Sequence, residues 1–148
     1  MKRSNLALIV VVAGSLLLIA ILTLAVPKNE PEKKGAAEAT VVIDFGGQAP
    51  SETGPGTPVP WTINVTLDNG TVFGALEKAS RAADFTFRSE WYPNFRSHRV
   101  TGIAGVGDGT DNRYWQFYLN GVYTSTGADL AAVGDGDTVR WEFRAALQ

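Results

Sequence analysis

Residues 61–83 read WTINVTLDNGTVFGALEKASRAA, and this stretch predicts a strand, a turn and a helix in direct succession. Apolar side chains alternate with polar ones over Trp61–Leu67, which is the pattern of a strand with one buried face. Asp68-Asn69-Gly70 is a typical turn sequence. Thr71 is a favourable helix N-cap residue, and the apolar positions that follow it keep helical spacing as far as Ala83. We therefore expect a strand followed at once by an amphipathic helix.

A second strand is predicted upstream of this unit. Thr40–Phe45 places Val41, Ile43 and Phe45 on one face, and a Gly/Pro-rich loop over residues 46–60 joins it to Trp61. The two strands are expected to form a wide hairpin.

Several strands are predicted downstream of the helix. Phe85 and Phe87 indicate a strand start, whereas residues 88–99 (RSEWYPNFRSHR) show no periodicity and predict an irregular loop. A short strand is expected over residues 100–105. Arg113–Leu119 alternates strongly and ends in Asn120-Gly121, a strong signal for a two-residue hairpin turn.

The last strand follows a turn at residues 134–137 and directs Val139, Trp141 and Phe143 inward. A hairpin, one helix and several later strands predict an α+β fold in which one helix packs across a sheet. We expect Trp61, Trp115 and Trp141 in its core.

The N-terminal stretch Leu6–Val26 is apolar apart from Gly14, Ser15 and Thr23, and carries no charge. About 20 such residues are needed for a transmembrane helix. Lys2 and Arg3 precede it and favour a cytoplasmic N-terminus. The alternative is a secretory signal peptide cleaved after Thr23-Leu24-Ala25, although the apolar run is longer than a usual signal core.

Composition excludes several classes of function. The 148 residues contain no cysteine and a single histidine, which excludes disulfides, thiol catalysis and multi-histidine metal sites. Residues 1–34 hold five basic and two acidic groups, while residues 35–148 hold eight basic and 13 acidic groups. An acidic domain of this kind argues against nucleic acid as a partner.

Four segments in the second half of the chain resemble a known family. These are Val72–Ala79 (VFGALEKA), Thr101–Val106 (TGIAGV), Tyr114–Gly121 (YWQFYLNG) and Gly134–Trp141 (GDGDTVRW). They occur in the order found in prokaryotic transcobalamin C-terminal-like domains of unknown function, which are related to the β-domain of transcobalamin and intrinsic factor. The resemblance covers about 75 residues, and no single segment is specific.

The resemblance implies a β-grasp-like mixed sheet with one packed helix. In the vitamin carriers this domain covers one face of the bound corrinoid, and a separate helical barrel supplies the other face. No such barrel is expected among these residues, so cobalamin or another corrinoid is a candidate ligand by resemblance only. No cofactor is required by the sequence.

Neither catalysis nor metal binding is predicted. His98 is the only imidazole, and we expect it in a solvated loop without a nucleophile beside it. Asp108, Asp111 and Asn112 could offer oxygens to Ca²⁺, as could Asp135 and Asp137, but neither run has the EF-hand spacing and both suit tight turns.

Ligand contact is predicted for an aromatic and arginine-rich group of side chains. Flat aromatic faces beside guanidinium groups suit a ring-bearing or anionic ligand. Alternatively, these aromatic side chains cover a sheet edge. The candidates are Trp91, Tyr92, Phe95, Arg96 and Arg99, together with Tyr114, Gln116 and Tyr118 on the polar face of the predicted strand.

Two sequons, Asn64-Val65-Thr66 and Asn69-Gly70-Thr71, make Asn64 and Asn69 candidate glycosylation sites if the host glycosylates exported chains.

The predicted organisation is a cytoplasmic tail (1–5), a transmembrane anchor (6–26), a flexible stalk (27–39) and one extracytoplasmic domain (40–148). We expect a single-pass cell-membrane protein whose domain binds an unknown small molecule without catalysis. The alternatives are a domain that docks a surface protein partner and binds no small molecule, and a chain secreted after signal cleavage.

Overall fold

The computed structural model describes residues 36–55 and 60–146. The predicted anchor at residues 6–26 lies outside these ranges, as does most of the predicted stalk. Within the described ranges, no helix has both the length and the apolar composition needed to cross a bilayer.

The predicted hairpin is confirmed as strands β1 (Ala37–Asp44) and β2 (Trp61–Leu67), which pair antiparallel. Burial alternates residue by residue along both strands, so one face of the hairpin belongs to the core. β1 begins earlier than the sequence predicted, at Ala37, where the Glu38 backbone N–H donates to Asp135 Oδ1 at 2.9 Å.

Helix α2 (Val72–Ala83) has the predicted bounds. The Thr71 hydroxyl accepts a hydrogen bond from the Gly74 backbone N–H at 3.2 Å, which satisfies one of the free amides of the first turn. The helix buries Val72, Ala75, Leu76 and Ala79 on one stripe.

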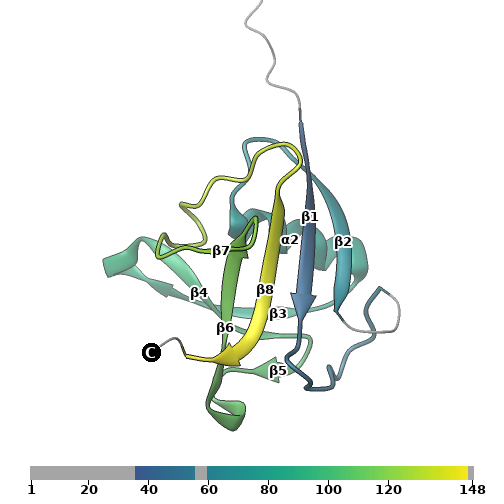
Figure 1. Ribbon diagram of the computed structural model, residues 1–148, viewed down its shortest axis with the longest axis vertical. Coiled ribbons are helices and arrows are strands. Elements are labelled where there is room, and N and C mark those ends of the chain that lie inside the picture. Colours follow the sequence, from purple (N-terminus) through teal and green to yellow (C-terminus); the bar gives the residue numbers. More distant parts are fainter. Residues whose placement is uncertain (1–35, 56–59, 147–148) are drawn as a thin grey trace, which may run out of the picture. The chain divides into compact units, whose positions relative to one another are not determined.

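The first sheet is mixed and has the order β2-β1-β8-β6-β7. Its later strands are β6 (Arg113–Leu119), β7 (Val122–Tyr123) and β8 (Thr138–Ala145). β8 lies parallel to β1 and antiparallel to β6, so this last strand is inserted between β1 and the β6–β7 hairpin at the edge of the sheet (Figure 1). Among the described residues, one α-helix with a strand-rich remainder confirms the α+β class.

The predicted turn at Asn120-Gly121 is also confirmed. Both residues have positive φ, 51° and 78°, as the two central residues of a tight hairpin turn require. The Asn120 side chain also links the turn to β8, because its Oδ1 accepts a hydrogen bond from the Thr138 backbone N–H at 2.9 Å.

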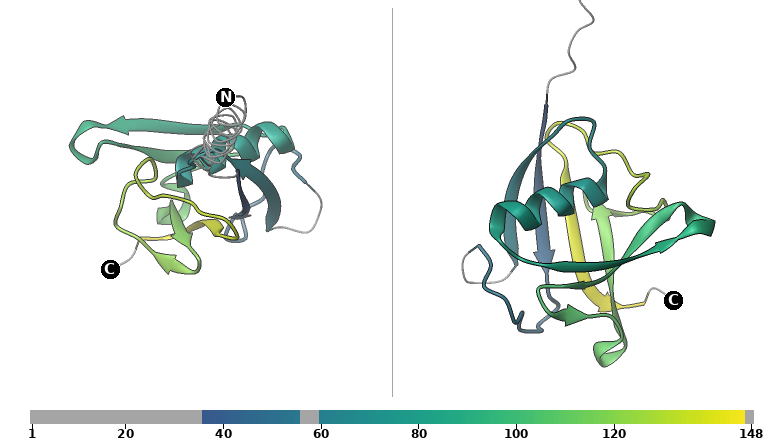
Figure 2. Two further views of the ribbon diagram at one scale, coloured as in Figure 1. Left: turned by 90° about the horizontal axis from the view of Figure 1, so that it is seen from above. Right: turned by 180° about the vertical axis from the view of Figure 1, so that it is seen from behind.

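The prediction of an irregular loop over residues 88–99 is wrong. Strands β3 (Phe87–Tyr92) and β4 (Ser97–Ile103) pair antiparallel around the 3₁₀ turn η2 (Pro93–Phe95), and β5 (Val106–Gly107) completes a second, three-stranded sheet. Four consecutive residues of β3 are exposed, so the strand lacks the alternation that marks a half-buried strand. Helix α2 and this second sheet lie on the same face of the first sheet (Figure 2).

Aromatic side chains fill the core between the layers. Phe45 is fully buried, and its ring meets those of Trp61 and Trp115 edge-on, with centroid distances of 4.8 and 5.6 Å. Trp141 packs against Phe117 at 5.3 Å. The three tryptophans predicted to be buried are 2–6% exposed, so their core assignment is confirmed.

Thr71→Ala is expected to lower the free energy of unfolding by about 1 kcal/mol, because one amide of the first helical turn loses its acceptor. Thr71→Ser keeps the hydroxyl and should remain close to wild type. Urea unfolding followed by circular dichroism measures both. Equal losses in the two variants would show that the cap contributes nothing.

Candidate ligand-binding cavity

A cavity of about 410 Å³ lies where strand β4, strand β6 and the segment after β7 meet. Four of the predicted ligand-contact residues line it, namely Tyr92, Phe95, Arg99 and Gln116. The remaining wall residues come from both sheets and from one connecting segment: Ser97, His98, Val100, Trp115, Phe117, Tyr123, Thr124, Ser125, Thr126, Gly127, Ala128 and Trp141.

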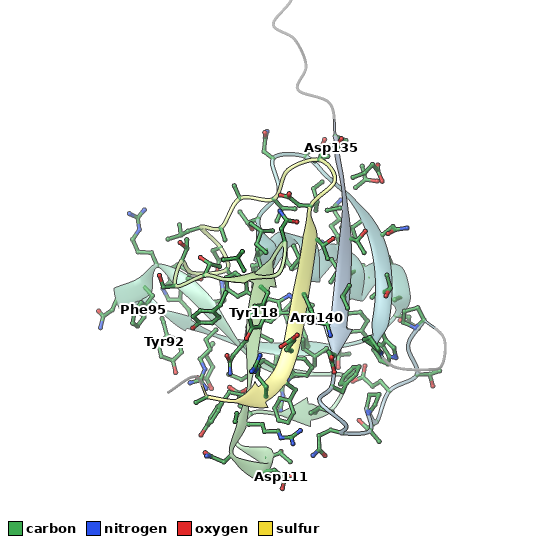
Figure 3. The ribbon with its side chains drawn as sticks, in the orientation of Figure 1. Tyr92, Phe95, Asp111, Tyr118, Asp135 and Arg140 are labelled. Atoms are coloured by element: carbon green, nitrogen blue, oxygen red, sulfur yellow. The ribbon has the colours of Figure 1, made fainter. Side chains whose placement is uncertain are left out.

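The other four predicted contacts are not among the lining residues, although Trp91 contacts His98 and Tyr114 lies beside Arg99. Trp91 is 52% exposed on β3, and Arg96 is exposed in left-handed conformation at the end of the η2 turn. Tyr114 and Tyr118 alternate with the core residues of β6 and point to the opposite face. Figure 3 shows Tyr118 beside Arg140 over the first sheet, and Tyr92 and Phe95 near the β3–β4 turn.

Arg99 lines this cavity and also a neighbouring hollow, where Glu90 and Asp108 lie. Its Nη2 donates to Asp108 Oδ2 at 2.7 Å, and its guanidinium lies 5.7 Å from the centre of the Tyr114 ring. Burial alone would lower the pKa of Arg99, but the neighbouring Tyr92 and Asp108 raise it above its ordinary value. The guanidinium is therefore held charged, with further N–H donors besides the one on Asp108.

Asp129 holds the start of β4 in place through hydrogen bonds. Its Oδ2 accepts from the His98 backbone N–H at 2.6 Å and from the Ser97 hydroxyl at 3.0 Å, and its Oδ1 lies 3.1 Å from His98 Nδ1. The Ser97 hydroxyl in turn accepts from the Asp129 backbone N–H at 3.2 Å. Gly127 is required beside it, since a Cβ there would lie 2.3 Å from the Ser97 Cβ.

The charge state of Asp129 follows from this network. Burial by itself would raise the pKa of the carboxyl, but hydrogen bonds from the His98 backbone, the His98 ring and the Ser97 hydroxyl lower it below its ordinary value. Asp129 is therefore an ionised acceptor at neutral pH.

His98 is not the solvated loop histidine that the sequence suggested. It belongs to β4 and stacks on Phe73 with a centroid distance of 4.6 Å and an interplanar angle of 13°. Trp91 meets its edge at 5.0 Å. The sequence did not predict these contacts, because Phe73 is distant in the chain and the pairing of Trp91 with His98 depends on strands β3 and β4, which were missed.

Trp141 lines the cavity, but its indole nitrogen has almost no accessible surface and is a buried donor without a partner. Trp141 is 2% exposed, and its Nε1–H makes no hydrogen bond, whereas Nε1–H of Trp115 donates to the Val106 carbonyl at 2.9 Å. Leaving such a donor unpaired costs about 1–3 kcal/mol. Gln116 Oε1 is unpaired as well, but the amide of that residue is directed to the Ala145 carbonyl, 2.9 Å from Nε2. The sequence pattern predicted that Trp141 lies in the core, but it did not predict that its N–H is unpaired.

The aspartates considered for Ca²⁺ act within the protein as acceptors. Asp108 Oδ1 accepts from the Trp115 backbone N–H at 2.9 Å, Asp111 accepts from Gln48 at 2.8 Å, and Asp137 accepts from Asn120 at 2.8 Å. Over residues 36–55 and 60–146, no group of three or more histidine, aspartate or glutamate side chains is arranged to hold a metal ion.

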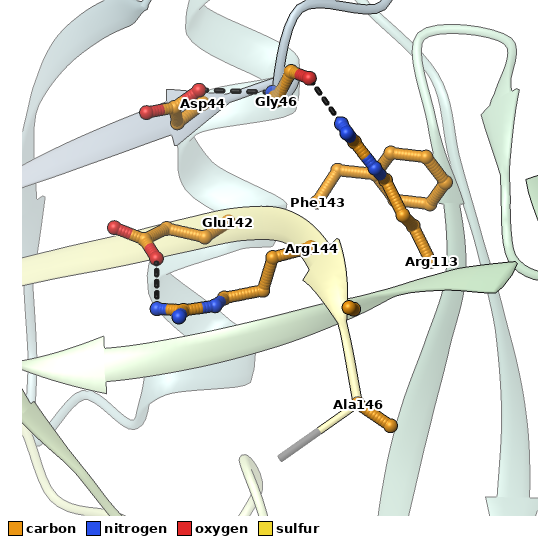
Figure 4. A pocket seen from close by; sticks show the side chains of 8 residues that line it. Asp44, Gly46, Arg113, Glu142, Phe143, Arg144 and Ala146 are labelled. Atoms are coloured by element: carbon orange, nitrogen blue, oxygen red, sulfur yellow. Dashed lines mark hydrogen bonds and ion pairs between the residues drawn. The ribbon is translucent and has the colours of Figure 1, made fainter. Parts of the chain in front are cut away.

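A second hollow of about 470 Å³ lies at the other end of β8 (Figure 4). Its polar groups satisfy one another: Asp44 Oδ1 accepts from the Gly46 N–H at 2.9 Å, Arg113 donates to the Gly46 carbonyl, and Arg144 pairs with Glu142 at 3.2 Å. This hollow is larger than the cavity beside β4, but Phe143 is the one aromatic side chain among its lining residues, so it suits a ring-bearing ligand less well.

The two glycosylation candidates are both exposed. Asn64 lies on the polar side of β2, with its Oδ1 accepting from the Thr40 hydroxyl at 3.1 Å. Asn69 lies in the predicted turn with a φ of 51°.

Solved structures of other proteins are similar to this fold. The crystal structure of haptocorrin in complex with Cbi matches with a TM-score of 0.58 and 23% identity, over 75% of this chain and 26% of haptocorrin. The chain thus corresponds to about a quarter of haptocorrin, and the likeness concerns the fold. A "putative metal binding protein" from Ruminococcus gnavus matches with a TM-score of 0.48 and 17% identity, over 75% of this chain and 99% of that one.

Comparison by sequence gives the family. No curated protein matches the chain. Residues 69–145, from the turn before α2 to the end of β8, match the model of a domain of unknown function, DUF4430. This span includes every segment in which the sequence resembled the transcobalamin C-terminal-like domains. The chain is a member of the DUF4430 family, with a transcobalamin-like domain of unknown function.

Proposed function

We propose that this protein is a membrane-anchored, extracytoplasmic binding module that holds a small molecule and catalyses no reaction. In this proposal residues 6–26 form the anchor, residues 27–39 the stalk and the remainder a β-grasp-like domain outside the cell. The alternative topology is secretion after signal cleavage. The strand order, with β8 parallel to β1 and one helix crossing the sheet, supports the β-grasp-like description.

One observation carries the binding function: the cavity beside β4 has walls formed largely by aromatic side chains from both sheets. Binding sites for small molecules are typically apolar hollows with a few placed polar groups.

The likeness to haptocorrin makes a corrinoid one candidate ligand, because that protein was crystallised with Cbi. The match spans 26% of haptocorrin, so the corrinoid remains a candidate by resemblance. The proposed function requires no catalytic cofactor.

The arrangement of Ser97, His98 and Asp129 supports a non-catalytic role. In a nucleophilic triad the imidazole lies between the hydroxyl and the carboxylate. Here the Ser97 hydroxyl donates directly to Asp129 at 3.0 Å, and Ser97 is 3% exposed. The hydrogen bonds of these three residues link the start of β4 to the segment after β7. None of the three is an activated nucleophile.

A second candidate function is docking of a surface protein partner. Large apolar side chains are exposed on the β3–β4 hairpin and on β7: Trp91 at 52%, Phe95 at 69% and Val122 at 67%. In this alternative a partner covers these side chains and the domain binds no small molecule.

Equilibrium dialysis of the full-length chain in lipid nanodiscs tests the binding function. The probes are cyanocobalamin, cobinamide and a panel of small ring compounds. Ser125→Phe places a ring at the exposed lip of the cavity and should weaken binding at least tenfold, whereas Ser89→Phe, exposed on β3 and away from the cavity, should not. Equal binding by both variants would place the ligand elsewhere, and no binding by the wild type would favour partner docking.

Protease treatment of intact cells tests the topology. The proposed orientation predicts that added protease removes the domain while an epitope at the N-terminus survives. Full protection of the domain would contradict the extracytoplasmic assignment, and an epitope lost from cells before treatment would indicate signal cleavage.

A further inference from the structure

We infer that the cavity beside β4 takes a short peptide in extended conformation, whose central residue pairs with Phe117 on the open edge of β6 and directs an aromatic side chain into the cavity. This inference rests on the proposed binding function and adds the chemical class of the ligand. The backbone of β6 carries it, and no charge on the wall is involved.

Strand β6 is paired along its whole length on one side and at one end on the other. β8 pairs with all of Arg113–Leu119. Among the described residues, β7 covers Tyr118 and Leu119 and ends at Tyr123, after which the chain leaves the sheet and residues 124–128 form another wall of the cavity. The cavity therefore lies beside β6 at the place where β7 ends.

The hydrogen bonds at the start of β6 show which backbone groups face this edge. The Arg113 carbonyl accepts from the Gly109 backbone N–H at 2.8 Å, and the Trp115 backbone N–H donates to Asp108 Oδ1 at 2.9 Å. Neither partner belongs to β8, so Arg113 and Trp115 direct these groups away from β8. The direction of the backbone groups alternates with a period of two along an antiparallel strand. Phe117 therefore directs its N–H and C=O to the same edge, beyond the reach of β7.

An extended peptide that continues the line of β7 would pair with Phe117 through both of these groups. In binding by strand addition, main-chain hydrogen bonds give affinity and pockets for alternate side chains give specificity. Asp108 already accepts from the Trp115 N–H at one end of the open edge, and β7 pairs with Leu119 at the other end. The edge between them accommodates one paired residue with its neighbours, so the peptide is short.

The residue opposite Phe117 points into the cavity. Directly opposed residues of antiparallel strands place their side chains on the same face, and the Phe117 ring packs on the core side against Trp141 at 5.3 Å. Trp115 and Val100 line the cavity on this side. At about 410 Å³ the cavity falls in the lower part of the range for ligand sites, roughly 300–1,000 Å³, and its rings suit an aromatic side chain.

Pentapeptides test the ligand class on the full-length chain in nanodiscs. They have acetylated and amidated ends and the sequence threonine-serine-X-serine-threonine, where X is phenylalanine, tyrosine, tryptophan or alanine. In equilibrium dialysis, at least one aromatic peptide is expected to bind at least tenfold more tightly than the alanine peptide. Lengthening that peptide at both ends should change its affinity less than threefold, and a tenfold gain would overturn the assignment of a short ligand.

N-methylation distinguishes strand pairing from other modes of binding. A methyl group on the nitrogen of X removes the N–H that donates to the Phe117 carbonyl, and should weaken binding at least tenfold. The matched control carries the methyl group on the nitrogen of the serine after X. That N–H points away from β6, so binding should weaken less than threefold.

Amide hydrogen exchange tests the same pairing from the side of the protein. In the free protein, Phe117 should exchange faster than Gln116 and Tyr118, whose N–H groups face β8. A saturating aromatic peptide should slow exchange at Phe117 at least tenfold. Exchange at Phe117 that is already as slow as at its two neighbours would show that the edge of β6 is not open.

The outcomes separate the ligand class from the binding function. Equal effects of the two methyl groups, or a bound peptide that leaves exchange at Phe117 unchanged, overturn strand pairing and leave a binding module in place. Failure of every aromatic peptide while cobinamide or another ring compound binds does the same. Failure of all peptides, corrinoids and ring compounds to bind overturns both the ligand class and the proposed function.

Discussion

Phe45→Ala is expected to lower the free energy of unfolding by about 3–5 kcal/mol, the largest stability loss that we predict for a single substitution in this domain. Phe45 is fully buried, and its ring contacts Trp61 and Trp115 edge-on. Alanine would leave a void between the two indoles that the surrounding β1–β2 hairpin cannot close. Urea unfolding followed by tryptophan fluorescence measures the loss.

Phe95→Ala is the matched control, because it removes the same side chain from the β3–β4 turn, where Phe95 is 69% exposed. We expect a change within about 0.5 kcal/mol. Comparable losses in the two variants would contradict the assignment of Phe45 to the core and Phe95 to the surface. Phe45→Ala should also weaken ligand binding, since Trp115 forms part of the cavity wall.

Asp129→Ala is expected to cost about 3 kcal/mol, because it leaves donors of Ser97 and His98 without their charged acceptor at a buried point of β4. Asp135→Ala is the control. That carboxylate accepts an exposed bond from the Glu38 backbone N–H, so its loss should stay below about 1 kcal/mol. Similar losses for the two variants would mean that the Asp129 network does not support the fold.

The same network predicts a pH dependence. Because the pKa of Asp129 is lowered in the folded protein, its stabilising effect is complete above the ordinary carboxyl pKa and is lost as the pH falls through the lowered value. The stability advantage of the wild type over Asp129→Asn should therefore be largest above about pH 5 and shrink as the pH falls below about 4. Unfolding measured from pH 7 to pH 3 tests this, and a difference independent of pH would contradict it.

Local patterns were sufficient to predict much of the first sheet. Trp61–Leu67, Val72–Ala83 and Arg113–Leu119 have the predicted bounds, because each element buries one face and so carries a period of two or of about four residues. The turn at Asn120-Gly121 was equally clear, because two adjacent positive φ values leave few alternatives to this residue pair.

Strands β3 and β4 were missed for a physical reason. β3 exposes four consecutive residues, so its hydrogen bonds with β4 form without an alternating pattern of burial. The aromatic and arginine content of residues 88–99 correctly drew attention to this region, and Tyr92, Phe95 and Arg99 do line the cavity.

The rest of the candidate site depends on contacts between distant parts of the chain. Asp129 reaches His98 across 31 positions, and Trp141 lies opposite Phe117 on a neighbouring strand. Whether a buried indole N–H finds an acceptor depends on the packing of all these segments together. A single sequence gives no local signal for such a feature.

The location of a bound ligand tests the central claim most directly. Backbone ¹⁵N–¹H spectra of the full-length chain in nanodiscs, recorded with and without a saturating concentration of the ring compound that binds in dialysis, report which amides the ligand affects. A ligand in the cavity beside β4 should produce its largest shifts at Ser97–Val100 and Thr124–Ala128, with little change around Gly46 and Arg144. Largest shifts around Gly46 and Arg144, or no shift at any amide, would contradict the assignment of this cavity as the binding site.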